Sequence, residues 1–194
     1  MGTDGKDGAC KIRMIFRLLD RLTPSMSVRP TEDQLTAHRL RIISGGQTGV
    51  DRGALDAALQ RGWPCGGTCP KGRRAENGRI PERYPLVEAV SGRWDVRTRI
   101  NVDAADATLI LVPKMPLQGG TRLTAEYACE KGKPMLIQSE LWDTDMVCDW
   151  LDSIGPETLN VAGPRESGAP GIGRAAASFI GKVLDRLSAS GWTG

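Results

Sequence analysis

Two glycine-containing segments are the residues of this sequence best suited to bind an anion. The first reads Ser-Gly-Gly-Gln-Thr-Gly-Val-Asp over residues 44–51, and the second reads Pro-Leu-Gln-Gly-Gly-Thr over residues 116–121. Glycines let the backbone turn tightly and bring N–H groups toward a ligand, and a following helix N-terminus adds partial positive charge. Both segments therefore predict contacts to a phosphate or another oxyanion.

The first segment differs from the two common nucleotide-binding motifs. It has neither the Gly-x-Gly-x-x-Gly spacing nor the lysine of a Walker loop, which disfavours plain NAD binding and ordinary ATP hydrolysis. The alternative is a tight turn that binds nothing, with Asp51 capping the next helix. The candidate ligand-binding residues of the two segments are Gly45, Gly46, Gln47, Thr48, Gly49, Gly119, Gly120 and Thr121.

A basic segment over residues 69–83 is the third candidate element. It holds five basic and two acidic residues, and it is longer than the usual connection of roughly 2–6 residues in such folds. We predict that Lys71, Arg73 and Arg74 close over an anionic ligand as a cationic lid. A solvated surface loop is the alternative.

Several further residues are weaker candidates. Arg97 and Asn101 lie on a predicted helix, and Arg165 follows the last predicted strand, at the same edge of the sheet as the glycine segments. If the protein were an enzyme, its catalytic acid would come from one of three carboxylates. These are Asp51, Glu126 and Glu166.

Strands alternate with helices along the chain. The predicted strands cover residues 40–44, 63–68, 86–90, 107–112, 135–137 and 158–162, and the predicted helices cover 50–61, 94–105, 121–131, 141–154 and 171–187. Short, almost continuous apolar strands between helices predict a mainly parallel sheet covered on both faces. The fold class is therefore α/β, a single Rossmann-like, doubly wound domain. In the usual strand order 3-2-1-4-5, the first and fourth strands are neighbours, and both glycine segments meet in one crevice.

The domain organisation follows from length and composition. The chain has 194 residues, of which 40% are hydrophobic and 25% charged, an ordinary globular composition. We expect an N-terminal extension over residues 1–38, weakly structured or forming a short amphipathic helix. The ligand-binding domain is predicted over 39–190, and a tail over 191–194.

Charge and composition exclude several function classes. The net charge of +3 is too small to call for nucleic acid, and no apolar run reaches the ~18–20 residues of a membrane span. One histidine disfavours His-based catalysis and His-rich metal sites, and the five scattered cysteines predict no disulfide framework, as suits the cytoplasm. No structural zinc is expected from Cys65 and Cys69, although a lowered pKa or affinity for a soft metal stays open.

Four blocks of this sequence together resemble the molybdenum carrier (molybdenum cofactor carrier) family. The blocks are residues 44–56, 69–81, 119–121 and 160–167, and the resemblance spans about residues 40–187. It implies a Rossmann-like fold, oligomers, and binding of molybdenum cofactor or molybdate. That cofactor is a pterin with a terminal phosphate and an oxo-molybdenum centre, so its two ends would suit two glycine loops and a cationic lid.

The wider relatives implied by this resemblance are the Rossmann-like phosphoribohydrolases, a superfamily also called lysine decarboxylase-like. Their loop reads Pro-Gly-Gly-x-Gly-Thr-x-x-Glu. Alignment on Gly120 and Thr121 places Leu117 and Gln118 where that loop has glycines, and Thr124 where it has the glutamate. Glu126 lies two residues on, about 200° around the helix. This departure counts against hydrolase chemistry.

The sequence thus favours a cytoplasmic binding protein for molybdenum cofactor or molybdate over an enzyme. Two alternatives stay open: a nucleotide 5′-monophosphate phosphoribohydrolase, and a nucleotide-sensing module acting through residues 1–38. The expected partner is a small anionic ligand, with no nucleic acid and no membrane. We also expect a homo-oligomer, a dimer or a tetramer, in which some of the five tryptophans are buried between subunits.

Overall fold

The structure is a computed structural model that describes residues 40–192. The predicted N-terminal extension, residues 1–38, lies outside the described residues, as do the last two residues of the predicted tail. Within residues 40–192, no helix combines the length and the apolar character that crossing a membrane requires.

The main sheet has five strands, and every neighbouring pair is parallel. Its strands, in spatial order, are β2 (Cys65–Gly66), β1 (Arg41–Ile43), β9 (Thr158–Ala162), β7 (Ala107–Val112) and β8 (Met135–Ser139). Their carboxyl ends therefore lie along one edge of the sheet. The α/β, Rossmann-like fold class predicted from the sequence is confirmed.

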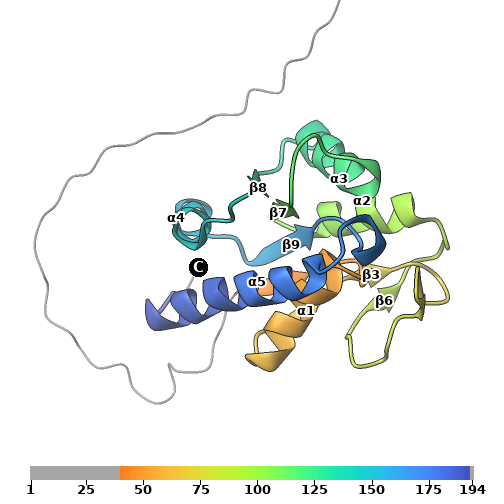
Figure 1. The fold of residues 1–194 in the computed structure, drawn as a ribbon, viewed down its shortest axis with the longest axis horizontal. Coiled ribbons are helices and arrows are strands. Elements are labelled where there is room, and N and C mark those ends of the chain that lie inside the picture. The colour runs from red at the N-terminus through yellow and green to blue at the C-terminus, as the bar shows by residue number, and fades with distance from the viewer. Residues whose placement is uncertain (1–39, 193–194) are drawn as a thin grey trace, which may run out of the picture. The chain divides into compact units, whose positions relative to one another are not determined.

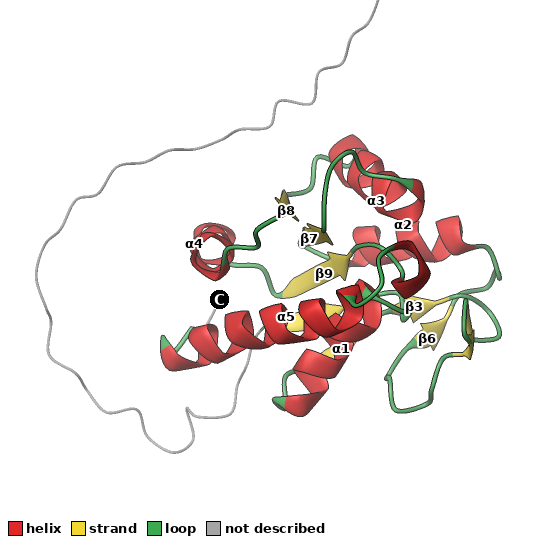
Figure 2. Ribbon diagram, viewed as in Figure 1, coloured by secondary structure: helices red, strands yellow, loops and turns green. Residues whose placement is uncertain are grey.

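Helices cover both faces of this sheet (Figures 1 and 2). They are α1 (Val50–Gln60), α2 (Trp94–Ala104), α3 (Gly119–Glu130), α4 (Thr144–Ile154) and α5 (Ile172–Ala189), with a short 3₁₀ helix, η2 (Glu166–Gly168). All six residues of β7 are buried, and alternate side chains serve opposite faces. Leu109 and Leu111 pack in the core with α1, α4 and α5, whereas Ile110 and Val112 pack with Ala125 of α3.

The predicted strand order is wrong, because β9 lies between β1 and β7. Leu159 is in register with Ile42 on one side and with Ala107 on the other. Close backbone contacts fix this position: a Cβ on Gly53 of α1 would lie 2.4 Å from the carbonyl oxygen of Gly173 in α5. Strand β9 thus pairs with β1, and α5 packs against α1. The loop after β9 therefore lies at the centre of the carboxyl edge of the sheet.

The basic segment has more structure than the sequence suggested. It contains an antiparallel hairpin, β4 (Arg74–Ala75) and β5 (Gly78–Arg79), and is flanked by β3 (Thr68–Cys69) and β6 (Val87–Glu88), which pair in parallel outside the main sheet. The predicted strand at 86–90 is therefore not part of the main sheet. A separate small core lies beneath this region, formed by Leu55, Cys69, Ile80, Tyr84 and Leu86.

Candidate functional site

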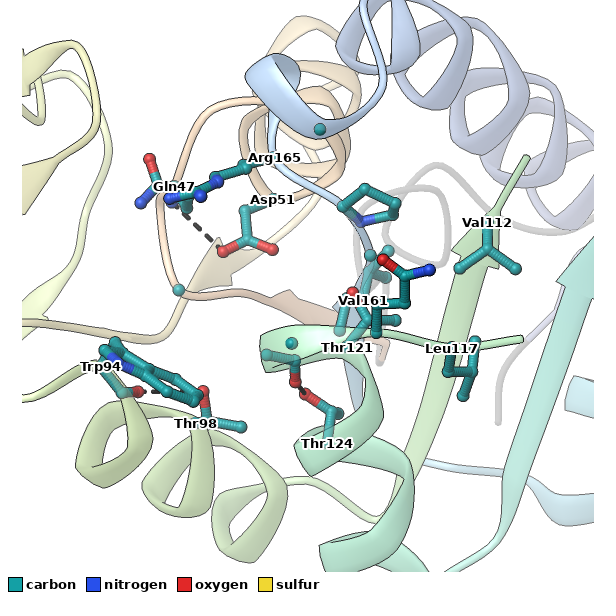
Figure 3. A pocket seen from close by; sticks show the side chains of 18 of the residues that line it. Gln47, Asp51, Trp94, Thr98, Val112, Leu117, Thr121, Thr124, Val161 and Arg165 are labelled. Carbon is teal, nitrogen blue, oxygen red and sulfur yellow. Dashed lines mark hydrogen bonds between the residues drawn. The ribbon is translucent and has the colours of Figure 1, made fainter. Parts of the chain in front are cut away.

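A cavity of about 620 Å³ opens at the carboxyl edge of the sheet. Its walls come from the segments that follow β1, β7 and β9, and from α2. Figure 3 shows Trp94 and Thr98 of α2 on one side, Thr121 and Thr124 of α3 beside them, and Asp51 and Arg165 across the cavity. The structure thus brings both glycine segments to one cavity, with the loop after β9 between them.

The charged side chains that line this cavity are mostly cationic. Arg97, Lys114 and Arg165 contribute three positive charges, and Asp51 contributes the one carboxylate among the described lining residues. Helix α3 begins at the cavity, with Gln118 at its N-cap and no side chain capping it. Its first N–H groups and its dipole add partial positive charge there. An anion is the ligand that this lining favours.

Arg97 is held in place by Asp51. Its Nη1 donates to Asp51 Oδ2 at 2.9 Å, and the two side chains are only 17% and 6% exposed. The guanidinium occupies the space where Gly45 lacks a side chain, because a Cβ there would lie 1.3 Å from Nη1. Arg97 Nε is buried and has no hydrogen-bond partner among residues 40–192. Asp51 therefore positions a cation at the cavity.

Gly46, Thr48 and Gly49 shape the first loop from outside the cavity lining. Gly46 has a φ of +74°, and a Cβ there would lie 2.4 Å from Leu86 Cδ1. Gly49 has a φ of +78°, and a Cβ would lie 2.4 Å from the carbonyl oxygen of Pro164. Glycine is needed at Gly46 and Gly49 for this close packing, and the contacts of this loop to a ligand stay a prediction.

The Glu76 carboxylate ties three loops together. It accepts hydrogen bonds from the hydroxyls of Thr48 and Ser167, and Arg165 Nε lies 3.4 Å away. The backbone N–H of Glu76 donates to Gln47 Oε1 at 3.0 Å. Burial raises the pKa of Glu76, but the hydrogen bonds from Ser167 and Thr48 outweigh it and hold the pKa below its ordinary value. An ionised Glu76 therefore stabilises the wall of the cavity.

Replacing Glu76 with glutamine is expected to lower the free energy of unfolding at neutral pH by about 1 kcal/mol, a value reduced by solvent screening. Because the folded-state pKa lies below the ordinary value, this contribution is full above the unfolded-state pKa. It is lost as the pH falls through the folded-state pKa. Urea unfolding of both proteins across the acidic range measures the difference, with Glu126→Gln as a control on the surface of α3. A difference that grows on acidification would contradict the assignment.

The three cations of the predicted lid, Lys71, Arg73 and Arg74, have different positions in the structure. Arg73 is 4% exposed, and its guanidinium donates to four backbone carbonyls at 2.9–3.1 Å, so it holds the segment together. Those carbonyls belong to Ile80, Pro81, Tyr84 and Leu86. Lys71 is exposed outside the residues that line the cavity. Arg74 lines a smaller hollow of about 320 Å³, which shares Gly45, Gln47, Trp94 and Arg97 with the main cavity.

The other two candidate acids are not among the described residues that line the cavity. The side chain of Glu126 is 62% exposed and pairs with Arg122 at 3.5 Å on the surface of α3. The Glu166 carboxylate accepts hydrogen bonds from the N–H groups of Gly171 and Gly173, at the start of α5. Both roles are structural, which corrects the candidacies of Glu126 and Glu166.

Two of the weaker candidates have different positions. Asn101 lines the cavity, but its amide accepts from Thr68 N at 2.8 Å and donates to Thr68 O at 3.0 Å, which ties α2 to β3. Arg165 follows β9 and lies at the cavity, with a side chain 62% exposed. Arg165 is therefore the better candidate for direct ligand contact.

Sequence reasoning missed Trp94 and Lys114. It expected some of the tryptophans to be buried between subunits, but Trp94 lies in the cavity wall and is 55% exposed. The signal was present: Trp94, Arg97, Thr98 and Asn101 have the i, i+3, i+4, i+7 spacing of one helix face, and all four line the cavity. The other four tryptophans pack in or against the main core.

The three free cysteines among residues 40–192, Cys65, Cys69 and Cys148, all have a raised pKa. Burial raises the pKa of Cys65 and Cys69, so the lowered pKa that the sequence left open is wrong. Cys69 belongs to the small core under the basic segment. No group of three or more metal-binding side chains is present within residues 40–192.

Comparison with known proteins gives two matches. A family model described as the circularly permutated YpsA SLOG family matches residues 42–184. A crystal structure described as a "putative molybdenum carrier protein" from Syntrophus aciditrophicus SB is 40% identical, with a TM-score of 0.70. The match covers 74% of this chain and 94% of that one. No curated protein matches the chain.

Proposed function

Since the chain belongs to the circularly permutated YpsA SLOG family and resembles a molybdenum carrier over most of its described length, we propose that it binds molybdenum cofactor or molybdate in the cavity at the sheet's carboxyl edge. In this proposal the ligand is cargo, held and released without chemical change. The similarity to a carrier supports a carrier-like role in general. The choice of molybdenum cofactor or molybdate as the ligand is the proposal.

The observation that carries the proposal is the cationic lining of a cavity with room for a small molecule. Its volume of about 620 Å³ is within the range of roughly 300–1,000 Å³ for small-molecule sites. Phosphate and oxo-molybdenum oxygens accept hydrogen bonds, and Arg97, Lys114 and Arg165 are donors without acceptor capacity. The buried Arg97 Nε, which lacks a described partner, fits such a ligand.

A carrier requires these residues to bind and orient the ligand and to limit its contact with water. Asp51 fixes the Arg97 guanidinium before the ligand arrives, which reduces the entropy lost on binding. Lys114 and Arg165 are both exposed, so the ligand can enter and leave past them. The direct test is whether the protein carries molybdenum and a fluorescent pterin when it is purified from a host that makes the cofactor.

The phosphoribohydrolase alternative requires a carboxylate near the glycosidic bond, because the departing base must be protonated or the developing cation stabilised. Among the described lining residues, the one carboxylate is Asp51, which is paired with Arg97. Thr124 occupies the position of the expected glutamate, and its hydroxyl donates to Gly120 O at 2.9 Å. The geometry therefore favours a carrier over a hydrolase.

Incubation of the wild-type protein with AMP is expected to release no free adenine above the rate of a blank, because no positioned acid is available. Chromatography of the products measures this directly. Glu126→Gln is expected to behave like the wild type in this assay and in ligand binding. Adenine release by the wild type above the rate of the blank would make the hydrolase the better assignment.

The homo-oligomer and the cytoplasmic location stay predictions. Four of the five tryptophans pack in or against the core of the chain itself, so they offer little surface to a second subunit. We still propose a dimer or a tetramer, as the family resemblance implies. A nucleotide sensor acting through residues 1–38 would require a segment outside the described residues.

A further inference from the structure

Trp94 is the large apolar side chain that is exposed in the wall of the cavity. It is the first residue of α2, and its side chain is 55% exposed. Polar residues such as Arg97 and Thr98 line the same cavity. The Trp94 indole lies against the first turn of α3, because a Cβ on Gly120 would be 3.8 Å from ring atoms Cε3 and Cζ3. The indole thus lies within ordinary contact distance of the N-terminus of α3.

The surroundings of Trp94 combine a flat apolar surface with cationic groups. Arg97 lies one turn further along α2, and both Trp94 and Arg97 line the main cavity and the smaller hollow beside it. Thr98 Oγ1 donates to Trp94 O at 3.0 Å and lies below the ring in Figure 3. Trp94 therefore stands where a ligand in either hollow would contact the indole.

The rest of the cavity also offers more than an inorganic oxyanion can use. Apolar side chains contribute part of the lining, namely Val112, Pro113, Pro116, Leu117 and Val161. A tetrahedral oxyanion is satisfied by hydrogen-bond donors alone and gains little from apolar or aromatic surface. A planar heterocycle gains from both, since aromatic side chains stack on ring faces.

We propose that Trp94 is a stacking platform that makes the site selective for a planar nitrogen heterocycle bearing a phosphate, over bare molybdate or phosphate. This inference rests on the proposed anion-binding function of the same cavity. The cations hold the phosphate, and the indole holds the ring. A pterin and a purine share this chemistry, and binding measurements can separate them.

The test compares four probes by calorimetry: neopterin monophosphate, GMP, inorganic phosphate and molybdate. Trp94→Ala is expected to weaken binding of at least one ring-bearing probe about 10- to 100-fold and to leave phosphate and molybdate unchanged. Trp94→Phe keeps an aromatic face and is expected to retain most of the affinity. Leu141→Ala is the matched control, because Leu141 is 91% exposed and lies outside the cavity lining.

Fluorescence gives a readout that a merely structural role would not change. Stacking of a ring on Trp94 is expected to quench tryptophan emission in the wild type, and this part of the quenching is lost in Trp94→Phe. Whichever of neopterin monophosphate and GMP binds more tightly identifies the source of the heterocycle.

Each remaining outcome has a distinct meaning. If the wild type binds a ring-bearing probe and Trp94→Ala binds it equally well, the stacking role is wrong and the anion site stands. If the wild type binds phosphate or molybdate as tightly as both ring-bearing probes, the selectivity is wrong. If it binds none of the four, both this inference and the proposed function are overturned.

Discussion

Replacing Arg73 with alanine is expected to lower the free energy of unfolding by about 3–5 kcal/mol, which is a large share of the stability of an ordinary domain. Four backbone carbonyls would lose the donor that reaches all of them. An acceptor left buried without a partner costs roughly 1–3 kcal/mol, and water reaches some of these positions. Urea unfolding with an unchanged m-value would measure the loss as a lower midpoint.

The matched control for this prediction is Arg74→Ala. Arg74 is the next residue of the same segment and is exposed, so its removal is expected to change stability by no more than about 0.5 kcal/mol. A protein with Arg73→Ala that unfolds at the wild-type midpoint but binds anions more weakly would restore the lid that the sequence suggested.

Removing Lys114 and Arg165 together is expected to weaken anion binding about 100-fold. Each supplies a charged donor at the cavity, and a hydrogen bond to a charged group contributes about 1.5–3 kcal/mol. Both side chains are exposed, so the double variant Lys114→Ala, Arg165→Ala is expected to fold normally. Calorimetry with molybdate and with inorganic phosphate, at one fixed ionic strength, measures the change.

The control must change the net charge equally at a different place. Lys71→Ala, Arg79→Ala removes two exposed cations of the basic segment, outside the residues that line the cavity. It is expected to change the affinity by less than about threefold, because distant exposed charges are screened. Equal losses in the two double variants would mean that general positive charge, rather than this cavity, attracts the anion.

The elements of the fold were predictable where local pattern decides them. The run at 107–112 is apolar at nearly every position, and β7 is accordingly buried on both faces. The order of the strands was not predictable in this way. The position of β9 depends on contacts between residues far apart in sequence, such as Gly53 with Gly173, which no local pattern expresses.

The location of the candidate site at the carboxyl edge of the sheet was predictable, but the role of each residue was predictable only in part. Glycine segments after parallel strands were expected to meet at one edge, and they do line one cavity. The function of each cation was not predictable, because Arg73 and Arg74 are adjacent in sequence and only the fold buries one of them. Burial converts Arg73 from a candidate ligand contact into a structural element.

Trp94 shows the opposite case, in which an available signal was not used. Its spacing with Arg97, Thr98 and Asn101 places the four residues on one helix face. An amphipathic pattern does not show whether such a helix face packs on the core or lines a cavity. Without further information, a tryptophan is expected to be mostly buried. The glycine segment at 116–121, which was expected to bind an anion, would have favoured a position of Trp94 in the cavity wall over one in the core.

The most direct test of the central claim is to measure the molybdenum and pterin bound to the protein when it is purified from a host that makes molybdenum cofactor. Wild type and the double variant Lys114→Ala, Arg165→Ala would be purified in parallel, and molybdenum and fluorescent pterin measured per chain. We expect both to accompany the wild type in a near-stoichiometric amount and to be largely absent from the variant. A wild-type protein with neither molybdenum nor pterin, or a variant that retains both in full, would contradict the assignment of this cavity as the carrier site.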